Sequence, residues 1–282
     1  LKYINIPNNN FLRLTLAGIS LALAVLVRTP ALFLFIPIVG YLVFHKQWKQ
    51  LVLFAAVFIF LFIPWIIRNY EIYHIFIPTN LAYGIDLAAG NHPGASGELE
   101  PYELNDRLIS QYGYLKANSL LFKEALSFIF AHPLEFLKIT FYRISIYFSF
   151  SRPTGFWFHL HGLSKILTLA ASAFYSILLF TFGFFGILKI KDLIGQDKKR
   201  AKFLLAMLVM MPLAIVGIIV ETRYRFPVYP FFAIFAGYGF SEFLAWRINW
   251  KPAIYLILLL FLNTTFDVLR NWDRIIEKIN NL

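Results

Sequence analysis

The sequence predicts an all-α polytopic membrane protein with about seven transmembrane helices, and with interfacial and loop helices on the outer face of the membrane. Three observations support this class. Hydrophobic residues make up 59% of the 282 residues and charged residues 15%, whereas about one quarter of a soluble domain is charged. The mean hydropathy is +0.66. The 32 Phe, 15 Tyr and 6 Trp residues suit a protein surrounded by acyl chains, with aromatic rings at the headgroup levels.

Seven apolar segments are candidate membrane spans, because a spanning helix needs about 20 apolar residues, or fewer when it is shielded in a bundle. The first two form a tight hairpin that is broken at Arg28-Thr29-Pro30. The candidates lie near residues 11–27, 31–44, 51–67, 164–188, 203–220, 227–246 and 252–266.

The spans divide the chain into four parts. Residues 1–67 carry the first three spans, residues 68–163 form an extracytoplasmic loop with interfacial helices, residues 164–266 carry four further spans, and residues 267–282 form a short polar tail. The chain begins at Leu1, so we expect it to lack its natural N-terminus.

The long loop has a recognisable local pattern. Residues 90–97 are rich in Gly and predict turns, and residues 105–131 predict a helix that ends before Pro133. Residues 134–150 mix apolar and charged side chains, as expected for a helix in the interface plane. A shallow spanning helix is the alternative for this last segment.

The distribution of basic residues predicts the orientation. If the chain starts in the cytoplasm, its inner pieces are residues 1–13, 45–50, 189–202 and 247–251, which together hold 12 Lys and Arg. Short cytoplasmic loops favour Lys and Arg, so residues 68–163 lie outside. This predicts a multi-pass protein of the plasma membrane.

Several classes are disfavoured or excluded. The net charge of +11 is not gathered on one basic face, so no nucleic-acid partner is expected. There is no Cys, hence no disulfide framework and no thiolate metal site. His92 has no second ligand at a metal-like spacing, so we predict no metal site, and the sequence indicates no cofactor. The sequence does not decide whether the protein requires a divalent metal.

Arginines at the outer ends of the spans are candidate phosphate-binding residues. Arg28 follows an apolar run, where a lone cation is costly unless it is paired, and snorkelling to headgroups is the alternative. The segment Glu221 to Pro227 places three charges in a short outer connection. Arg223 and Arg225 could form bidentate hydrogen bonds to phosphate, and Glu221 could orient one of them or bind a sugar hydroxyl. A self-contained Glu–Arg pair that caps the helix hairpin is the alternative.

The outer loop offers further polar groups. The stretch from Pro78 through the glycines of residues 90–97 would allow a close approach of backbone and ligand, although ordinary turns explain the glycines equally well. No spacing singles out a general base among the outer carboxylates, which are Asp86, Glu98, Glu100, Glu103 and Asp106.

Four short motifs in series resemble the polyprenyl-phosphate-sugar-dependent membrane glycosyltransferases of the GT-C fold, the relatives of protein mannosyltransferases (glycosyltransferase family 39) and of the aminoarabinose transferase of lipid A. The resemblance covers about residues 14–245. The motifs are Leu26-Val27-Arg28-Thr29-Pro30, Pro64-Trp65-Ile66-Ile67-Arg68-Asn69, the loop from Thr79-Asn80 to Gly90-Asn91-His92-Pro93-Gly94-Ala95-Ser96-Gly97, and Glu221-Thr222-Arg223-Tyr224-Arg225-Phe226-Pro227.

The resemblance implies a glycosyltransferase that moves a hexosyl or pentosyl group from a lipid-linked donor to an acceptor hydroxyl of a lipid, glycan or protein outside the membrane. Arg28, Arg223 and Arg225 would bind the donor phosphate. The residues that bind substrate or position the loop would be Asn80, Asn91, Glu221 and Tyr224. The catalytic Asp of the family lies in a first outer loop, which this sequence does not contain, so the catalytic residue is unknown. The family often has Asn where this chain has His92.

Two other classes fit the same composition. A transporter or flippase would carry charges near the midplane between helical repeats, and this chain has few of them. A non-catalytic polytopic membrane protein is the remaining alternative. Neither the sugar, the acceptor nor the oligomeric state follows from the sequence.

Overall fold

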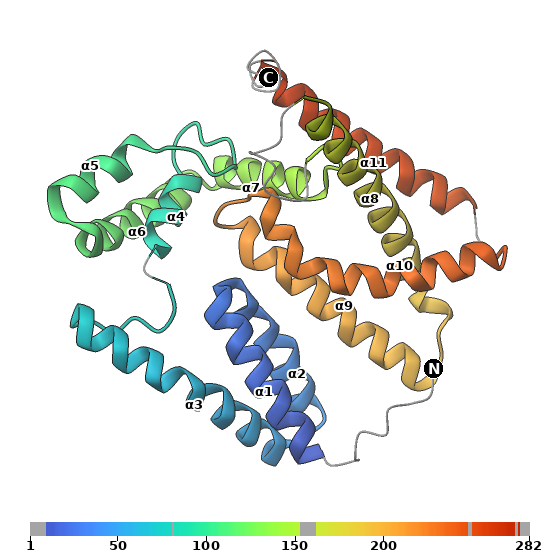
Figure 1. The fold of residues 1–282 in the computed structure, drawn as a ribbon, viewed down its shortest axis with the longest axis horizontal. Helices are drawn as coiled ribbons and strands as arrows, with labels where there is room; N and C mark the ends of the chain where they lie inside the picture. The colour runs from blue at the N-terminus through green and yellow to red at the C-terminus, as the bar shows by residue number, and fades with distance from the viewer. Residues whose placement is uncertain (1–9, 81, 153–161, 248–249, 274–275, 277–282) are drawn as a thin grey trace. The chain divides into compact units, whose positions relative to one another are not determined.

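A computed structural model describes residues 10–80, 82–152, 162–247, 250–273 and 276. The chain divides into two compact units, Leu1–Leu81 and Ala82–Leu282, and each is described by itself. The described residues form eleven α-helices and three 3-10 helices, and their only β contact is an isolated bridge between Glu98 and Val220 (Figure 1). The predicted all-α class is therefore confirmed.

The N-terminal unit is built from three α-helices and one 3-10 helix. They are α1 (Asn10–Val27), η1 (Thr29–Leu34), α2 (Phe35–Phe44) and α3 (Trp48–Tyr73). The predicted break between the first two spans is present, because Arg28 is extended and Pro30 lies in the first turn of η1. Gly18 allows α1 to approach α3, since a Cβ there would lie 3.2 Å from the carbonyl oxygen of Phe54.

The second unit begins with four helices. They are α4 (Tyr83–Gly90), α5 (Glu103–Tyr112), α6 (Tyr114–Ala131) and α7 (Pro133–Phe148). The single helix predicted over residues 105–131 is wrong, because Gly113 with φ of 76° separates α5 from α6. The helix predicted near residues 134–150 is present as α7. Helix α4 was not predicted, since its eight residues are too short for a clear periodic pattern.

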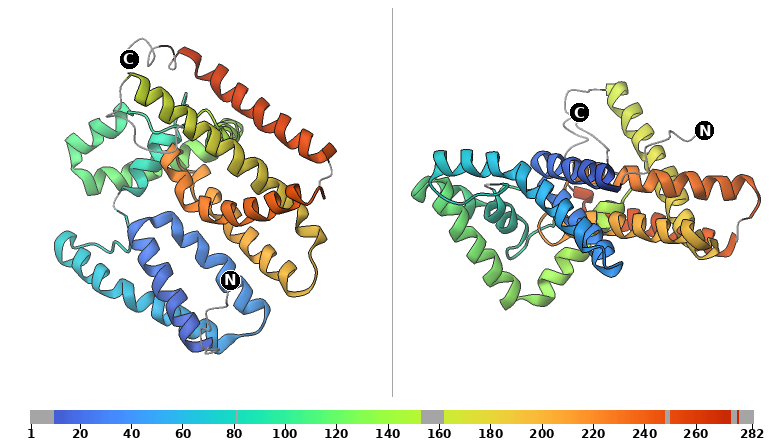
Figure 2. Two further views of the ribbon diagram at one scale, coloured as in Figure 1. Left: turned by 45° about the vertical axis from the view of Figure 1, so that its right-hand side comes forward. Right: turned by 90° about the horizontal axis from the view of Figure 1, so that it is seen from below.

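The rest of the second unit consists of apolar helices. They are α8 (Gly162–Leu188), η2 (Lys189–Asp192), α9 (Gly195–Val216), η3 (Thr222–Val228), α10 (Tyr229–Leu244) and α11 (Trp250–Arg270). Helices α8 and α10 pack closely through glycines (Figure 2). A Cβ on Gly186 would lie 2.0 Å from the carbonyl oxygen of Phe235, and one on Gly239 would lie 2.1 Å from that of Phe182. The two backbones therefore meet where neither carries a side chain.

Three helical segments are long and apolar enough to cross a membrane, namely Trp48–Tyr73, Gly162–Asp192 and Lys251–Arg270. Every one of the seven predicted spans coincides with helical structure, but the other four are too short or too polar by the same measure. Helix α11 also continues four residues beyond its predicted end at residue 266, into the segment expected to be a polar tail. The structure thus supports membrane association through at least these three helices.

Candidate functional site

Arg143 of α7 holds the glycine-rich loop in place. Its side chain is fully buried and donates to the carbonyl oxygens of Gly90 and Val216 and to the side-chain oxygen of Asn91. Burial lowers the pKa of Arg143 to about 9, so the guanidinium group is still protonated at neutral pH. One cation thus fixes α4, α7 and the end of α9 to one another.

Asn91 completes this attachment. It is 2% exposed, and its side-chain amide donates to the carbonyl oxygens of Leu87, Gly217 and Ile218. Gly90 is required at the same contact, because a Cβ would lie 1.9 Å from the carbonyl oxygen of Ile218. Asn91 therefore attaches the start of the glycine-rich loop to the segment that follows α9.

A charged cluster forms where α4 meets the start of η3. Arg223 makes an ion pair with Glu221, and its guanidinium carbon lies 5.6 Å from the centre of the Tyr224 ring. Burial and the charge of Glu221 raise the pKa of Asp86, whereas Arg223 acts in the opposite direction. Asp86, Glu221, Arg223 and Tyr224 are all partly exposed, and we name these four residues the surface cluster.

The ion pair between Arg223 and Glu221 is the one proposed in the alternative interpretation of this segment. It is not isolated, however, because Asp86 and Tyr224 interact electrostatically with both partners. A guanidinium group that interacts with two carboxylates and a phenol can orient a polar ligand, and it can also cap a helix hairpin.

Arg225 points to the other side of η3 and lies in the interior of the second unit. It is fully buried and donates to the carbonyl oxygen of Ile146 at 3.0 Å. Burial lowers the pKa of Arg225. Its other nitrogens and the hydroxyls of Tyr147, Tyr229 and Ser176 have no hydrogen-bond partner within normal geometry. Among the described residues Arg225 has no carboxylate partner, which is costly for a buried cation.

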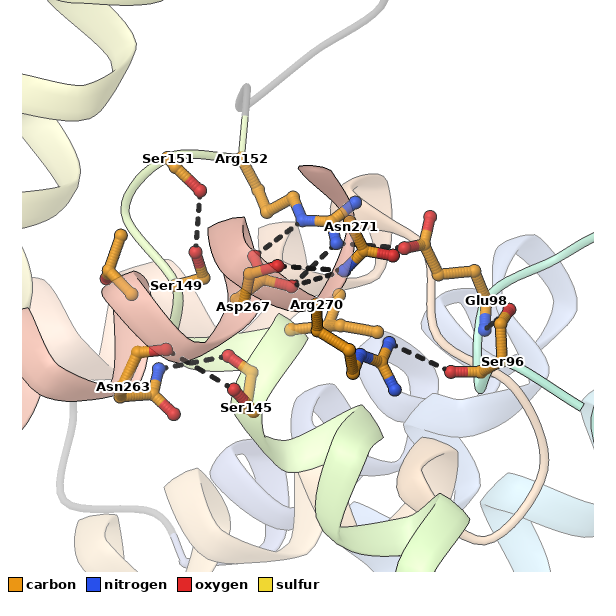
Figure 3. Close-up of polar contacts among 12 residues, drawn as sticks. Ser96, Glu98, Ser145, Ser149, Ser151, Arg152, Asn263, Asp267, Arg270 and Asn271 are labelled. Carbon is orange, nitrogen blue, oxygen red and sulfur yellow. Dashed lines mark hydrogen bonds and ion pairs between the residues drawn. The ribbon is translucent and has the colours of Figure 1, made fainter. Parts of the chain in front are cut away.

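A second charged network joins residues that lie far apart in the sequence (Figure 3). Arg152 donates to both carboxylate oxygens of Asp267, at 2.8 and 2.6 Å, and makes an ion pair with Glu98 at 2.8 Å. Asn271 also donates to Asp267, at 3.1 Å. Burial alone would lower the pKa of Arg152, but its two carboxylate partners outweigh this effect and raise it. The network attaches the loop after α4 to the end of α11.

The remaining predicted residues lie elsewhere. Arg28 and Asn80 are exposed residues of the N-terminal unit, whereas the surface cluster belongs to the second unit. The His92 ring stacks on that of Tyr102 with 4.1 Å between centres. No group of three potential metal ligands occurs among the residues that the structure describes.

Three functional candidates were not singled out by sequence reasoning. Asp86 was one of five outer carboxylates, and its raised pKa, which follows from burial and from the charge of Glu221, arises only in the folded chain. Arg143 lies within the segment 134–150 that was predicted to be an interfacial helix, and Arg152 follows this segment. No local pattern shows that their partners are carbonyl groups and carboxylates about 50 or more residues away.

The comparisons give no relative for this chain: no family model, no curated protein and no solved structure matches it.

Proposed function

We propose that the chain is the membrane-embedded part of a glycosyltransferase that uses a polyprenyl-phosphate-linked sugar on the extracytoplasmic face. The observation that carries this proposal is the surface cluster, in which Arg223 pairs with Glu221 and interacts electrostatically with the partly buried Asp86. A cation for a phosphate and carboxylates for hydroxyl groups are the two kinds of side chain that this transfer needs.

The leaving group of the reaction is a lipid phosphate, which gains negative charge as the glycosidic bond breaks. Arg223 would stabilise that charge at the level of the headgroups. Arg225 is attached to the same 3-10 helix and has donors without a partner, so it supports the phosphate site from the interior. Arg28 is kept as a candidate for binding the donor phosphate, on the basis of the family resemblance.

Asp86 and Glu221 would face the acceptor. A carboxyl group whose pKa is raised is better suited to take up a proton near neutral pH than an ordinary Asp. We assign Asp86 to hydrogen bonding of the acceptor hydroxyl, with Glu221 and Tyr224 orienting the sugar. The principal base is left to the first outer loop that the family resemblance implies.

A binding experiment tests the phosphate site without requiring a complete enzyme. The purified chain in nanodiscs is titrated with a polyprenyl monophosphate and with the corresponding polyprenol. We expect the polyprenyl phosphate to bind at least ten times more tightly than the polyprenol. The Arg223→Gln protein should lose about tenfold in affinity for the phosphate, which corresponds to one charge-assisted hydrogen bond of ~1.4 kcal/mol. Arg200→Gln is the matched control, because Arg200 is 77% exposed and is not part of the surface cluster.

Equal binding of the phosphate and the alcohol would contradict the proposal. So would an Arg223→Gln protein that is folded and binds as well as the Arg200→Gln protein. The transporter alternative is favoured by the buried cation Arg225 alone. It predicts movement of a charged solute into proteoliposomes, which the glycosyltransferase would not cause.

A further inference from the structure

An open pocket of about 310 Å³ lies between the glycine-rich loop, α7 and the C-terminal end of α11. Its size is at the lower end of small-molecule sites, ~300–1,000 Å³. It does not contain any residue of the surface cluster or of the Arg225 site. The polar residues that line it are Ser96, Glu135, Lys138, Tyr142, Arg270 and Asn271.

Two cations lie against one aromatic ring in this pocket. The guanidinium carbon of Arg270 is 4.1 Å and the ammonium nitrogen of Lys138 is 5.8 Å from the centre of the Tyr142 ring. Arg270 also donates to the carbonyl oxygen of Ser96 at 3.0 Å, which fixes its position (Figure 3). A phosphate group is the anion that Arg and Lys side chains bind most readily together.

Glu135 supplies the opposite charge. Its carboxylate accepts a hydrogen bond from the backbone amide of Gly94 at 3.3 Å, so it is held at the loop side of the pocket. It lies one helical turn before Lys138 and on the same side of α7. The pocket thus offers two cations and one carboxylate. The carboxylate would repel a bare phosphate dianion, and it would favour a phosphate compound that also carries an N–H donor.

An apolar stripe borders the pocket on the same helix. Leu134, Leu137 and Phe141 of α7 are 81%, 60% and 59% exposed. With 3.6 residues per turn, Leu134 lies four residues before Lys138 and Phe141 three residues after it, so both flank Lys138 on the helix surface. A ligand in the pocket can therefore extend an apolar chain along α7.

We propose that this pocket binds the headgroup of a phospholipid whose phosphate is followed by an N–H donor, as in phosphatidylethanolamine. The phosphate would lie between Lys138 and Arg270, the ammonium group at Glu135, and an acyl chain along Leu134 and Phe141. This inference does not depend on the proposed transfer reaction, because no residue of the surface cluster takes part in it.

The test uses the full chain in detergent micelles, titrated with dioctanoyl phosphatidylethanolamine, dioctanoyl phosphatidylcholine and free phosphoethanolamine. We expect the ethanolamine lipid to bind about tenfold more tightly than the choline lipid, because the choline group has no N–H for Glu135. It should also bind more tightly than phosphoethanolamine, which has the same charged groups but no acyl chains.

Variants separate the two charges. Lys138→Gln should weaken binding of the ethanolamine lipid about tenfold. Glu135→Gln should remove the preference for the ethanolamine lipid over the choline lipid. Lys123→Gln is the matched control, because Lys123 is exposed on α6 and does not line the pocket. An unchanged far-ultraviolet circular dichroism spectrum shows that each variant is folded.

Three results would overturn the proposal. Equal affinity for the two lipids would exclude the role of Glu135, and equal affinity for phosphoethanolamine and its lipid would make the ligand a soluble phosphate compound. A folded Lys138→Gln protein that binds like Lys123→Gln would place the lipid elsewhere. None of these results affects the polyprenyl phosphate titration, in which Lys138→Gln should behave as the wild type and Arg223→Gln should not.

Discussion

Removal of Arg152 should strongly destabilise the second unit. Its partner Asp267 has a side chain that is only 1% exposed, and in an Arg152→Gln protein this carboxylate would keep the hydrogen bond from Asn271 and the more distant charge of Arg270 but lose its ion-pair partner. A buried ion pair that loses one partner typically costs about 3–5 kcal/mol, because the other charge stays unpaired in a region of low polarity. Glu98 is 23% exposed and should add little, since it can turn to solvent.

The matched control is Arg200→Gln. Arg200 and Asp197 also form an ion pair, but their side chains are 77% and 75% exposed, so its loss should cost about 0–1 kcal/mol. The free energy of unfolding is measured in mixed micelles of dodecyl maltoside and sodium dodecyl sulfate by circular dichroism. If the two variants lose the same free energy of unfolding, the argument from burial is refuted.

A double variant tests the cause. Arg152→Met with Asp267→Leu removes both charges and replaces them with apolar groups of similar size. Since the charge left unpaired is the main cost, the double variant should be more stable than Arg152→Gln. A double variant less stable than the single one would mean that hydrogen-bond geometry, and not the unpaired charge, stabilises this region.

Four further variants test the same structure. Gly186→Ala should destabilise the protein by about 1–3 kcal/mol, because the new Cβ would lie 2.0 Å from a backbone oxygen of α10, whereas Gly40→Ala, with nothing within 4 Å, should gain about 0.5–1 kcal/mol. Thermal unfolding of both proteins checks the opposite signs. Asn118→Ala removes the acceptor of two backbone amides at the start of α4, 2.7 and 3.1 Å away, and should cost about 1–2 kcal/mol and speed hydrogen exchange there. The raised pKa of Asp86 favours its neutral form on folding, so its contribution is lost as the pH rises above about 4, and Asp86→Asn should remove that loss in unfolding measured across pH.

The helices that contain the long apolar runs were predictable from the sequence, because a long apolar run in a chain of this composition forms a helix. The break at Arg28 also followed from a local rule, since Pro30 can start a helix but cannot continue one. The break at Gly113 was missed, because a glycine within a helical pattern ends the helix in some contexts and is tolerated in others. The residues next to Gly113 did not decide whether the helix ends there or continues.

The candidate site was only partly predictable. Glu221, Arg223 and Tyr224 stand in one short segment, so their spacing was enough to single them out. Asp86 joins them only because Asn91 and Arg143 attach α4 to the end of α9 through backbone carbonyls. Every peptide group has a carbonyl, and the sequence does not say which ones a buried arginine will meet.

The connection between Arg152 and Asp267 also bears on the order in which the protein is made. The two residues are 115 positions apart, and Asp267 lies near the end of α11. Until α11 has been synthesised, Arg152 has only Glu98 as a carboxylate partner among the described residues, and the loop after α4 is held from one side. A chain truncated before Asp267 should therefore leave Arg152 without its buried partner and the loop after α4 less firmly attached.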